Sequence, residues 1–144
     1  MKKLLLLLLL PGLLAACKKK EDTPVKEVIA KKWTAKQVDE NSTVVYTKGA
    51  TNNIRLGYTQ FLLDLSSPTA VTYREFDAND FTGTWDVVNN EKLVLSNLTP
   101  QPTGSNGTLE FTINSASATE LVLTRLTASG KTGGSTNKYT LANP

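Results

Sequence analysis

Hydrophobic and polar residues alternate along most of the chain after Trp33. Leu109, Phe111 and Ile113, for example, alternate with polar neighbours, and a period of two is typical of strands that bury one face. Clusters of Gly, Pro, Asn and Asp separate these stretches at near-regular spacing. The pattern predicts strands over residues 33–39, 43–48, 54–65, 70–76, 81–88, 92–97, 108–114, 119–127 and 136–142. Eight or nine short strands spaced in this way indicate an all-β antiparallel barrel or sandwich.

One short segment before these strands has helical spacing instead. Val25, Val28 and Ile29 share one face of residues 23–32, with lysines on the other. Thr23 is a suitable N-cap and Pro24 suits the first helical position. Because ten residues form only a marginal helix in isolation, we expect this helix to dock on the strands.

The alternation also predicts the register of the hairpin formed by residues 81–97. Trp85 and Val87 lie on one face, and Leu93 and Leu95 must share that face if all four are buried. A two-residue turn at Asn89-Asn90 would place the two pairs on opposite faces. We therefore predict an odd loop, residues 89–91, that pairs Trp85 with Leu95.

The first seventeen residues differ from the rest in both pattern and composition. Two lysines precede a run of leucines at residues 4–10, which is typical of a signal peptide and too short to span a membrane. The sequence Leu14-Ala15-Ala16-Cys17 resembles the lipobox of bacterial lipoproteins, and Cys17 is the only cysteine in the chain. This resemblance implies a signal peptide at residues 1–16 and lipidation of Cys17 with acyl chains such as palmitate. It also implies a membrane anchor in the cell envelope, as an outer-membrane lipoprotein.

Residues 17–24 are expected to form the lipidated tether, and their charges have two interpretations. Lys18-Lys19-Lys20-Glu21-Asp22 is suited to a solvated spacer beside an anionic leaflet. The same lysines followed by acids resemble the surface-export signals of Bacteroidetes lipoproteins. The sequence leaves both interpretations open, and with them the face of the outer membrane.

The charge balance of the predicted domain excludes one class of partner. From Trp33 onward the chain has eight basic and ten acidic residues, so the basic character of the whole sequence comes from the anchor region. Nucleic-acid binding requires a basic face on the domain itself. No nucleic-acid partner is therefore expected.

The sequence also excludes several kinds of catalytic or metal site. It contains no histidine and one cysteine, which excludes a Ser-His-Asp triad and the usual zinc ligand sets. Residues 77–80 offer calcium-type oxygens but lack the spacing of a calcium loop, and turn formation explains them. Asp64, Glu75 and Asp86 are available as acids, with nothing to pair any two of them. We expect no enzyme activity, cofactor or metal.

The order of these features resembles the lipocalin-like lipoproteins of Bacteroidetes. The matching stretches are residues 32–36, which include Trp33, the sequence Gly83-Thr84-Trp85, and residues 120–125; Lys31 stands where lipocalins have Gly. The resemblance implies an up-and-down barrel of about eight strands over residues 25–144. It also implies that Trp33 plugs one barrel end below the helix and that a late-strand arginine, Arg125, covers it. By parity Arg125 points inward with Leu121 and Leu123, or else outward into solvent.

Two functions fit such a domain. In the first, the barrel is a non-catalytic module for a small apolar or amphipathic ligand, with lining residues Tyr58, Phe61, Trp85, Phe111 and Tyr139. In the alternative, it is a structural or partner-binding surface lipoprotein whose core is filled by side chains. An internal pocket of several hundred cubic ångströms would favour the ligand, and a filled core would favour the scaffold.

Overall fold

The computed structural model describes residues 22–144. The predicted signal peptide (1–16), Cys17 and all but the last residues of the predicted tether (17–24) lie outside the described residues. Among residues 22–144, no helix is both long and apolar enough to cross a membrane. In chain order the elements are α1 (Val25–Ile29), β1 (Lys32–Glu40), β2 (Thr43–Thr47), the 3-10 helix η1 (Leu56–Gln60), β3 (Leu62–Asp64), β4 (Ala70–Arg74), β5 (Asp80–Val88), β6 (Lys92–Thr99), β7 (Leu109–Ala116), β8 (Glu120–Arg125), the 3-10 helix η2 (Gly130–Thr132) and β9 (Asn137–Ala142).

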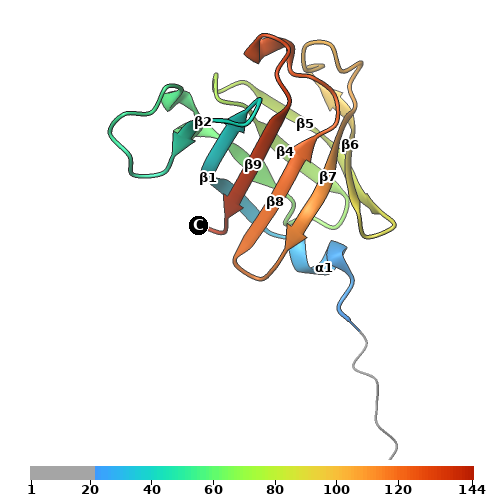
Figure 1. Cartoon of the computed structure of the whole chain (residues 1–144). Coiled ribbons are helices and arrows are strands. Elements are labelled where there is room, and N and C mark those ends of the chain that lie inside the picture. Colours follow the sequence, from blue (N-terminus) through green and yellow to red (C-terminus); the bar gives the residue numbers. More distant parts are fainter. Residues whose placement is uncertain (1–21) are drawn as a thin grey trace, which may run out of the picture.

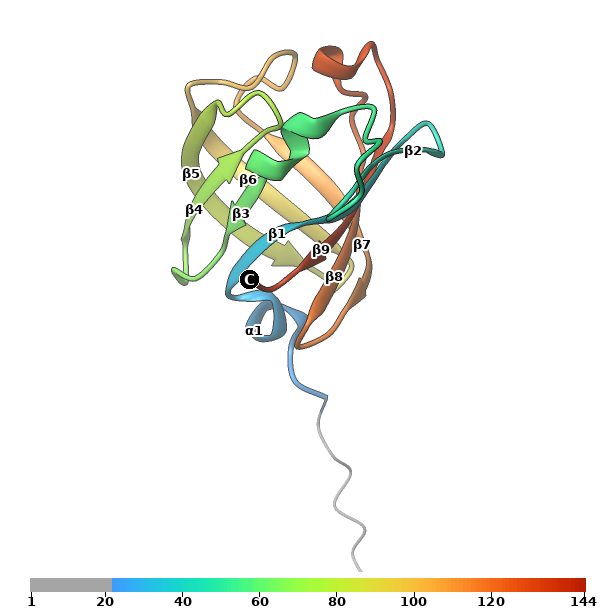
Figure 2. The same ribbon diagram turned by 90° about the vertical axis from the view of Figure 1, so that its left-hand side faces the viewer.

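The strands form a closed antiparallel barrel (Figures 1 and 2). From β3 to β9 each strand pairs with the next, and β9 returns to pair with β1. β1 also pairs with β3. Within residues 22–144, β2 pairs with no strand but β1, so the other eight of the nine strands close the barrel. This confirms the predicted all-β, up-and-down barrel of about eight strands with a short N-terminal helix.

The β5–β6 hairpin has the predicted register. Trp85 pairs with Leu95 and Val87 with Leu93, and the last pair is Val88 with Lys92. The intervening loop is residues 89–91, in which Asn89 and Asn90 have positive φ angles of 54° and 58°. Asn tolerates this left-handed conformation better than most residues, which explains how the odd loop forms.

Helix α1 is shorter than predicted. It spans Val25–Ile29 instead of residues 23–32, and Thr23 makes no capping hydrogen bond because Pro24 occupies the N-cap position. The helix ends because the carbonyl of Ile29 accepts hydrogen bonds from the Lys31 backbone N–H and the Trp33 indole N–H. From Lys32 the backbone pairs with β3 instead. The predicted apolar face is present: Ile29 is buried, with Val25 and Val28 packed on the core.

The predicted strand at residues 54–65 is wrong: the segment forms η1 followed by the short strand β3. Two strands pair with the same edge of β1: β2 along residues 37–40 and β3 along residues 32–34. A continuous strand over residues 54–65 would therefore find no free edge of that length on β1. The turn of η1 brings Gly57 so close to the chain at Phe76 that a Cβ at this position would collide with the Phe76 carbonyl oxygen.

Side chains fill the inside of the barrel. Alternate residues of β8 are buried, namely Leu121, Leu123 and Arg125. Of the two orientations that the sequence left open for Arg125, the structure has the inward one. The interior is apolar at the α1 end and contains charged and hydroxyl groups at the opposite end. The buried apolar residues of the whole core, which also draws on α1, β2 and η1, are Ile29, Trp33, Ala35, Val38, Val45, Tyr46, Tyr58, Phe61, Leu63, Leu65, Val71, Tyr73, Phe81, Trp85, Leu93, Leu95, Leu98, Leu109, Phe111, Leu121, Leu123, Tyr139 and Leu141.

Candidate functional site

Trp33 lies at the α1 end of the barrel with no exposed surface. Its indole Nε1–H donates to the carbonyl oxygen of Ile29, 2.9 Å away. The Lys31 ammonium lies 5.6 Å from the indole ring centre. The side chain thus fills the barrel end that α1 covers.

Arg125 points inward but does not cover Trp33, which corrects the expected pairing. The start of β8 is level with Trp33, since Glu120 pairs with Ala142 and Ala142 pairs with Thr34. Arg125 is at the other end of β8 and therefore at the other end of the barrel. Its Nη1 donates to Glu75 Oε1 over 3.4 Å, and both side chains are nearly fully buried.

Four of the five predicted ligand residues meet in the interior. The ring of Tyr139 is stacked with that of Phe61 at 5.1 Å and contacts Tyr58 at 6.3 Å and Phe111 at 6.1 Å. These rings pack on one another as a filled core. None of the four lines the surface hollows described below.

The fifth residue, Trp85, lies apart from this cluster and lines a hollow beside α1. Its indole Nε1–H donates to the Ser67 carbonyl oxygen at 2.8 Å, and the Lys26 ammonium lies 5.2 Å from its ring centre. Lys26 also pairs with Asp86 at 2.8 Å. The hollow has a volume of about 400 Å³ and a mainly apolar surface, and it is lined by Lys26, Glu27, Ala30, Ser66, Pro68, Thr69 and Trp85.

Two other hollows of similar size have walls that are about half polar. One, of about 390 Å³, lies beside the β1–β2 turn and is lined by Asp39, Asn41, Ser42, Thr124, Thr136 and Lys138. The other, of about 370 Å³, lies between β2 and residues 50–54. Ligand pockets are usually concave and apolar with a few polar groups at fixed places. The Trp85 hollow matches that description best.

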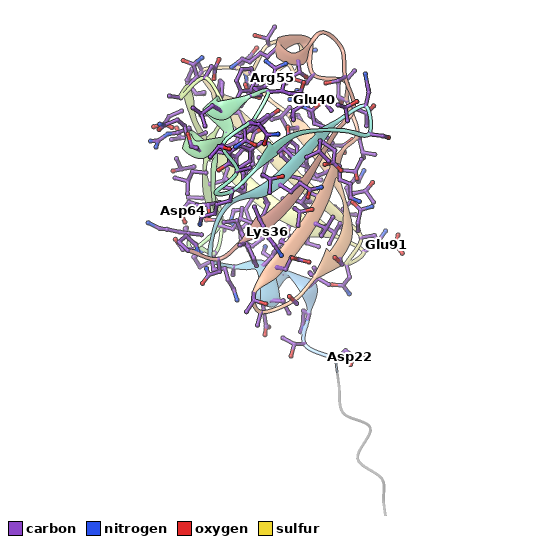
Figure 3. All side chains as sticks on the ribbon, turned by 60° about the vertical axis from the view of Figure 1, so that its left-hand side comes forward. Asp22, Lys36, Glu40, Arg55, Asp64 and Glu91 are labelled. Carbon is purple, nitrogen blue, oxygen red and sulfur yellow. The ribbon has the colours of Figure 1, made fainter. Side chains whose placement is uncertain are left out.

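The barrel end opposite α1 is closed by polar contacts. Figure 3 shows Glu40 and Arg55 together at this end, far from Asp22. Arg55 Nε lies 2.6 Å from Glu40 Oε1, and Arg55 Nη2 donates to Oε2 at 2.9 Å. Tyr58 donates its hydroxyl proton to Glu40 Oε1 at 3.0 Å. Burial, with Tyr139 and Glu40 nearby, raises the pKa of Tyr58 far above its usual range.

A second set of ion pairs holds residues 126–136 over the same end. Lys131 contacts a carboxylate oxygen of Glu75 and lies 2.9 Å from Asp77. Burial opposes the charge of Lys131, yet contacts with both acids raise its pKa. Burial likewise opposes the charge of Asp77, yet its hydrogen bonds with Lys131 and Asn79 hold its pKa below the usual value. Sequence spacing does not reveal this set, because Glu75 and Lys131 are far apart in the chain.

The acids considered in the sequence are each paired with a different cation. Asp64 lies 3.3 Å from Lys32, Asp86 pairs with Lys26, and Glu75 pairs with Arg125 and Lys131. In residues 77–80, the two carboxylates contact Lys131 and Arg74. Within residues 22–144, no group of three or more metal-ligating side chains is arranged to hold an ion.

No model of a known protein family matches the chain, and no curated protein matches it. Two crystal structures are similar to it. A lipocalin-like protein from Bacteroides uniformis ATCC 8492 is 14% identical, with a TM-score of 0.48, covering 81% of this chain and 99% of that one. An uncharacterized protein from Bacteroides eggerthii DSM 20697 is 10% identical, with a TM-score of 0.47, covering 79% and 98%. The lipocalin-like architecture of this chain is given by its own strand pairing, an antiparallel meander that closes on itself.

Proposed function

We propose that this protein is a lipid-anchored, non-catalytic envelope lipoprotein that binds a small apolar or amphipathic ligand. The observation that carries the proposal is the apolar hollow beside Trp85. The barrel interior, where the aromatic residues suggested a ligand, is filled because those rings pack against one another. A filled core favours the scaffold alternative for the interior, so the proposal places the ligand in this surface hollow instead.

The hollow has the features that such a ligand needs. Its volume of about 400 Å³ falls within the range of small-molecule pockets. Trp85 is 4% exposed, so its ring forms the buried floor of the hollow. Its N–H is already satisfied by Ser67, so binding an apolar group there leaves the indole N–H paired. Lys26 and Glu27 at the rim offer charges to a polar head group.

Tryptophan emission tests ligand binding directly, since the chain has two tryptophans. In a Trp33→Phe variant, Trp85 is the only indole, and titration with dodecanoate should change its emission saturably. In the matched Trp85→Phe variant, the emission of the buried Trp33 should not respond. The Trp85→Phe change should also weaken dodecanoate binding measured by calorimetry, whereas Trp33→Phe should lower stability and leave affinity unchanged. Binding that is lost in Trp33→Phe alone would refute this placement.

Anchoring is tested separately. Lipidation at Cys17 predicts that the wild-type protein incorporates a radioactive fatty acid and partitions with detergent. The Cys17→Ser variant should do neither, because the acceptor sulfur is gone. A Ser variant that still incorporates label would contradict the anchor.

A second candidate function, partner binding, is favoured by one exposed apolar surface. Val44 is 49% exposed, Ile54 72% and Leu56 63%, and all three belong to β2 or the segment that follows it. The outer edge of β2 is covered by this segment, where Arg55 N–H donates to Val45 and Asn53 bonds both backbone groups of Thr47. A partner would therefore contact these side chains instead of adding a strand. Photo-crosslinking in cells from position 54, with exposed position 114 as control, tests this candidate.

A further inference from the structure

The Trp85 hollow lies at the end of the barrel where the N-terminal chain enters. Figures 1 and 2 show α1 below one barrel end, with the η2 segment at the other. Three of the residues lining the hollow, Lys26, Glu27 and Ala30, belong to α1 or directly follow it. The hollow is therefore built partly from the first helix after the predicted tether.

The length of the tether limits how far this end can move from the anchor. Val25 follows Cys17 by eight residues. A fully extended chain spans at most about 3.6 Å per residue, or less than about 30 Å over this segment. A flexible chain of that length has a mean span of about 15 Å. If Cys17 is held in a bilayer, the α1 end of the barrel is the end closest to the lipid.

We infer that the hollow beside Trp85 docks on the membrane that holds the anchor, with a phospholipid acyl chain as its occupant. This rests on the proposed function, in which Cys17 is lipidated and the hollow binds an apolar group. The apolar walls of the hollow are open to water in the free protein, so covering them with an acyl chain removes apolar surface from water. Because the anchor already holds the domain at the bilayer, docking requires little further loss of translational freedom.

Charges around the hollow suit an interfacial position. The Lys26 ammonium lies over the Trp85 ring and pairs with Asp86 at the rim of the hollow. Because Lys26 is long and flexible, its ammonium can turn from Asp86 to a lipid phosphate, as lysines at a membrane interface do. Lys18, Lys19 and Lys20 precede the helix in the sequence and favour an anionic leaflet. The polar end with Glu40 and Arg55 then faces away from the membrane.

The single cysteine allows a direct test. The chain beginning at Cys17, carrying Trp33→Phe, is coupled through its thiol to a maleimide lipid in phosphatidylcholine vesicles whose acyl chains are brominated near the head group. Bromine quenches an indole only at close contact. Because Trp85 forms the floor of the hollow, an acyl chain in the hollow should lower its emission relative to unbrominated vesicles. The coupled Trp85→Phe variant, which reports on the buried Trp33, should lose little.

Two matched substitutions test the hollow itself. Ala30→Asp places a carboxylate in its wall and should restore Trp85 emission in brominated vesicles. Ala118→Asp adds the same charge at the same barrel end, where the Ala118 carbonyl accepts from Lys31, but outside the hollow, and should leave the quenching unchanged. Equal quenching in both variants would overturn the docking of the hollow.

The outcomes separate this inference from the proposed function. Unquenched Trp85 in coupled protein, together with saturable dodecanoate binding in solution, would overturn membrane docking and leave the ligand site standing. Unquenched Trp85 without dodecanoate binding would overturn both. Quenching that persists when the protein is coupled through a long Gly/Ser extension would show that the hollow binds lipid without help from the short tether.

Discussion

The two ends of the barrel are closed by different chemistry. At the α1 end, Trp33 and Ile29 have no exposed surface, and the only polar atom of the Trp33 side chain bonds to the helix. At the opposite end, Glu40 and Arg55 form a partly buried ion pair, and Glu75, Arg125 and Lys131 form another set that is more deeply buried. One end is held by removal of apolar surface from water, and the other by carboxylates that tie two loop segments to the strands.

This difference indicates which end is suited to hold a ligand. Groups that are already paired at the polar end are costly to separate, because a buried charge left without a partner is strongly unfavourable. The α1 end has an apolar hollow whose walls need no new polar partner. Binding of an apolar group is therefore expected beside α1, while the polar end keeps its loops closed.

The largest effect is expected from Trp33→Ala. Removing a buried tryptophan side chain typically costs about 3–5 kcal/mol, and here it also detaches α1 by removing the indole bond to Ile29. Urea unfolding should show this loss, and Trp33→Phe, which keeps an aromatic ring, should lose less. A Trp33→Ala protein within about 1 kcal/mol of wild type, the usual scale of a single point mutation, would contradict the role of Trp33 as a plug.

An intermediate effect is expected at the polar end from Glu40→Gln. The change keeps the shape of the side chain but removes the charge that accepts from Arg55 and Tyr58. Hydrogen bonds to charged groups contribute about 1.5–3 kcal/mol, and the same unfolding experiment should show a loss of that size. An unchanged free energy of unfolding would mean that the Glu40–Arg55 pair does not hold this end closed.

Acid should loosen the two ends at different pH values. The folded-state pKa of Asp77 is lowered, since its contacts with Lys131 and Asn79 outweigh the opposing effect of burial. Its contribution to stability is therefore complete above the unfolded-state value of about 4 and is lost as the pH falls through the lower folded value. As the pH falls below 4, the amides of Ser129 and Thr132 should lose hydrogen-exchange protection before the amide of Trp33. In the Asp77→Asn variant, the protection of Ser129 and Thr132 should no longer change over this pH range. Simultaneous loss at both ends would contradict the comparison.

The smallest effect is expected from Asp86→Asn beside the hollow. Asp86 is exposed, and its contact with Lys26 lies at the surface, where ion pairs contribute little. The urea midpoint should match that of wild type within error. A clear loss would show that Lys26 must be held by Asp86 for α1 to stay docked.

Much of the barrel could be predicted because the alternation of residues within single strands and hairpins determines it. The β5–β6 register followed from the requirement that Trp85, Val87, Leu93 and Leu95 share a face, and the observed pairing has this register. For Arg125, parity with Leu121 and Leu123 offered the inward orientation as one of two alternatives, and the structure has the inward one. The register prediction needed only the period of a strand and the length of one loop.

Features that depend on distant segments could not be predicted. Residues 54–65 have strand-like composition, but the edge they would need is divided between β2 and β3. The one local signal was Gly57, whose close approach to Phe76 excludes any side chain. Likewise, the partner of Arg125 is Glu75, fifty residues earlier, and no spacing rule links them. The filled interior depends on how four separate aromatic residues pack together.

The placement of the ligand site is tested most directly by nuclear magnetic resonance of the ¹⁵N-labelled domain titrated with dodecanoate. Binding in the hollow predicts saturable shifts of the Trp85 indole N–H and of the backbone amides of Lys26, Ala30 and Ser66, with the amides of Phe111 and Tyr139 unmoved. Saturable shifts centred on Phe61, Phe111 and Tyr139, with the Trp85 indole unmoved, would place the ligand inside the barrel and contradict the account.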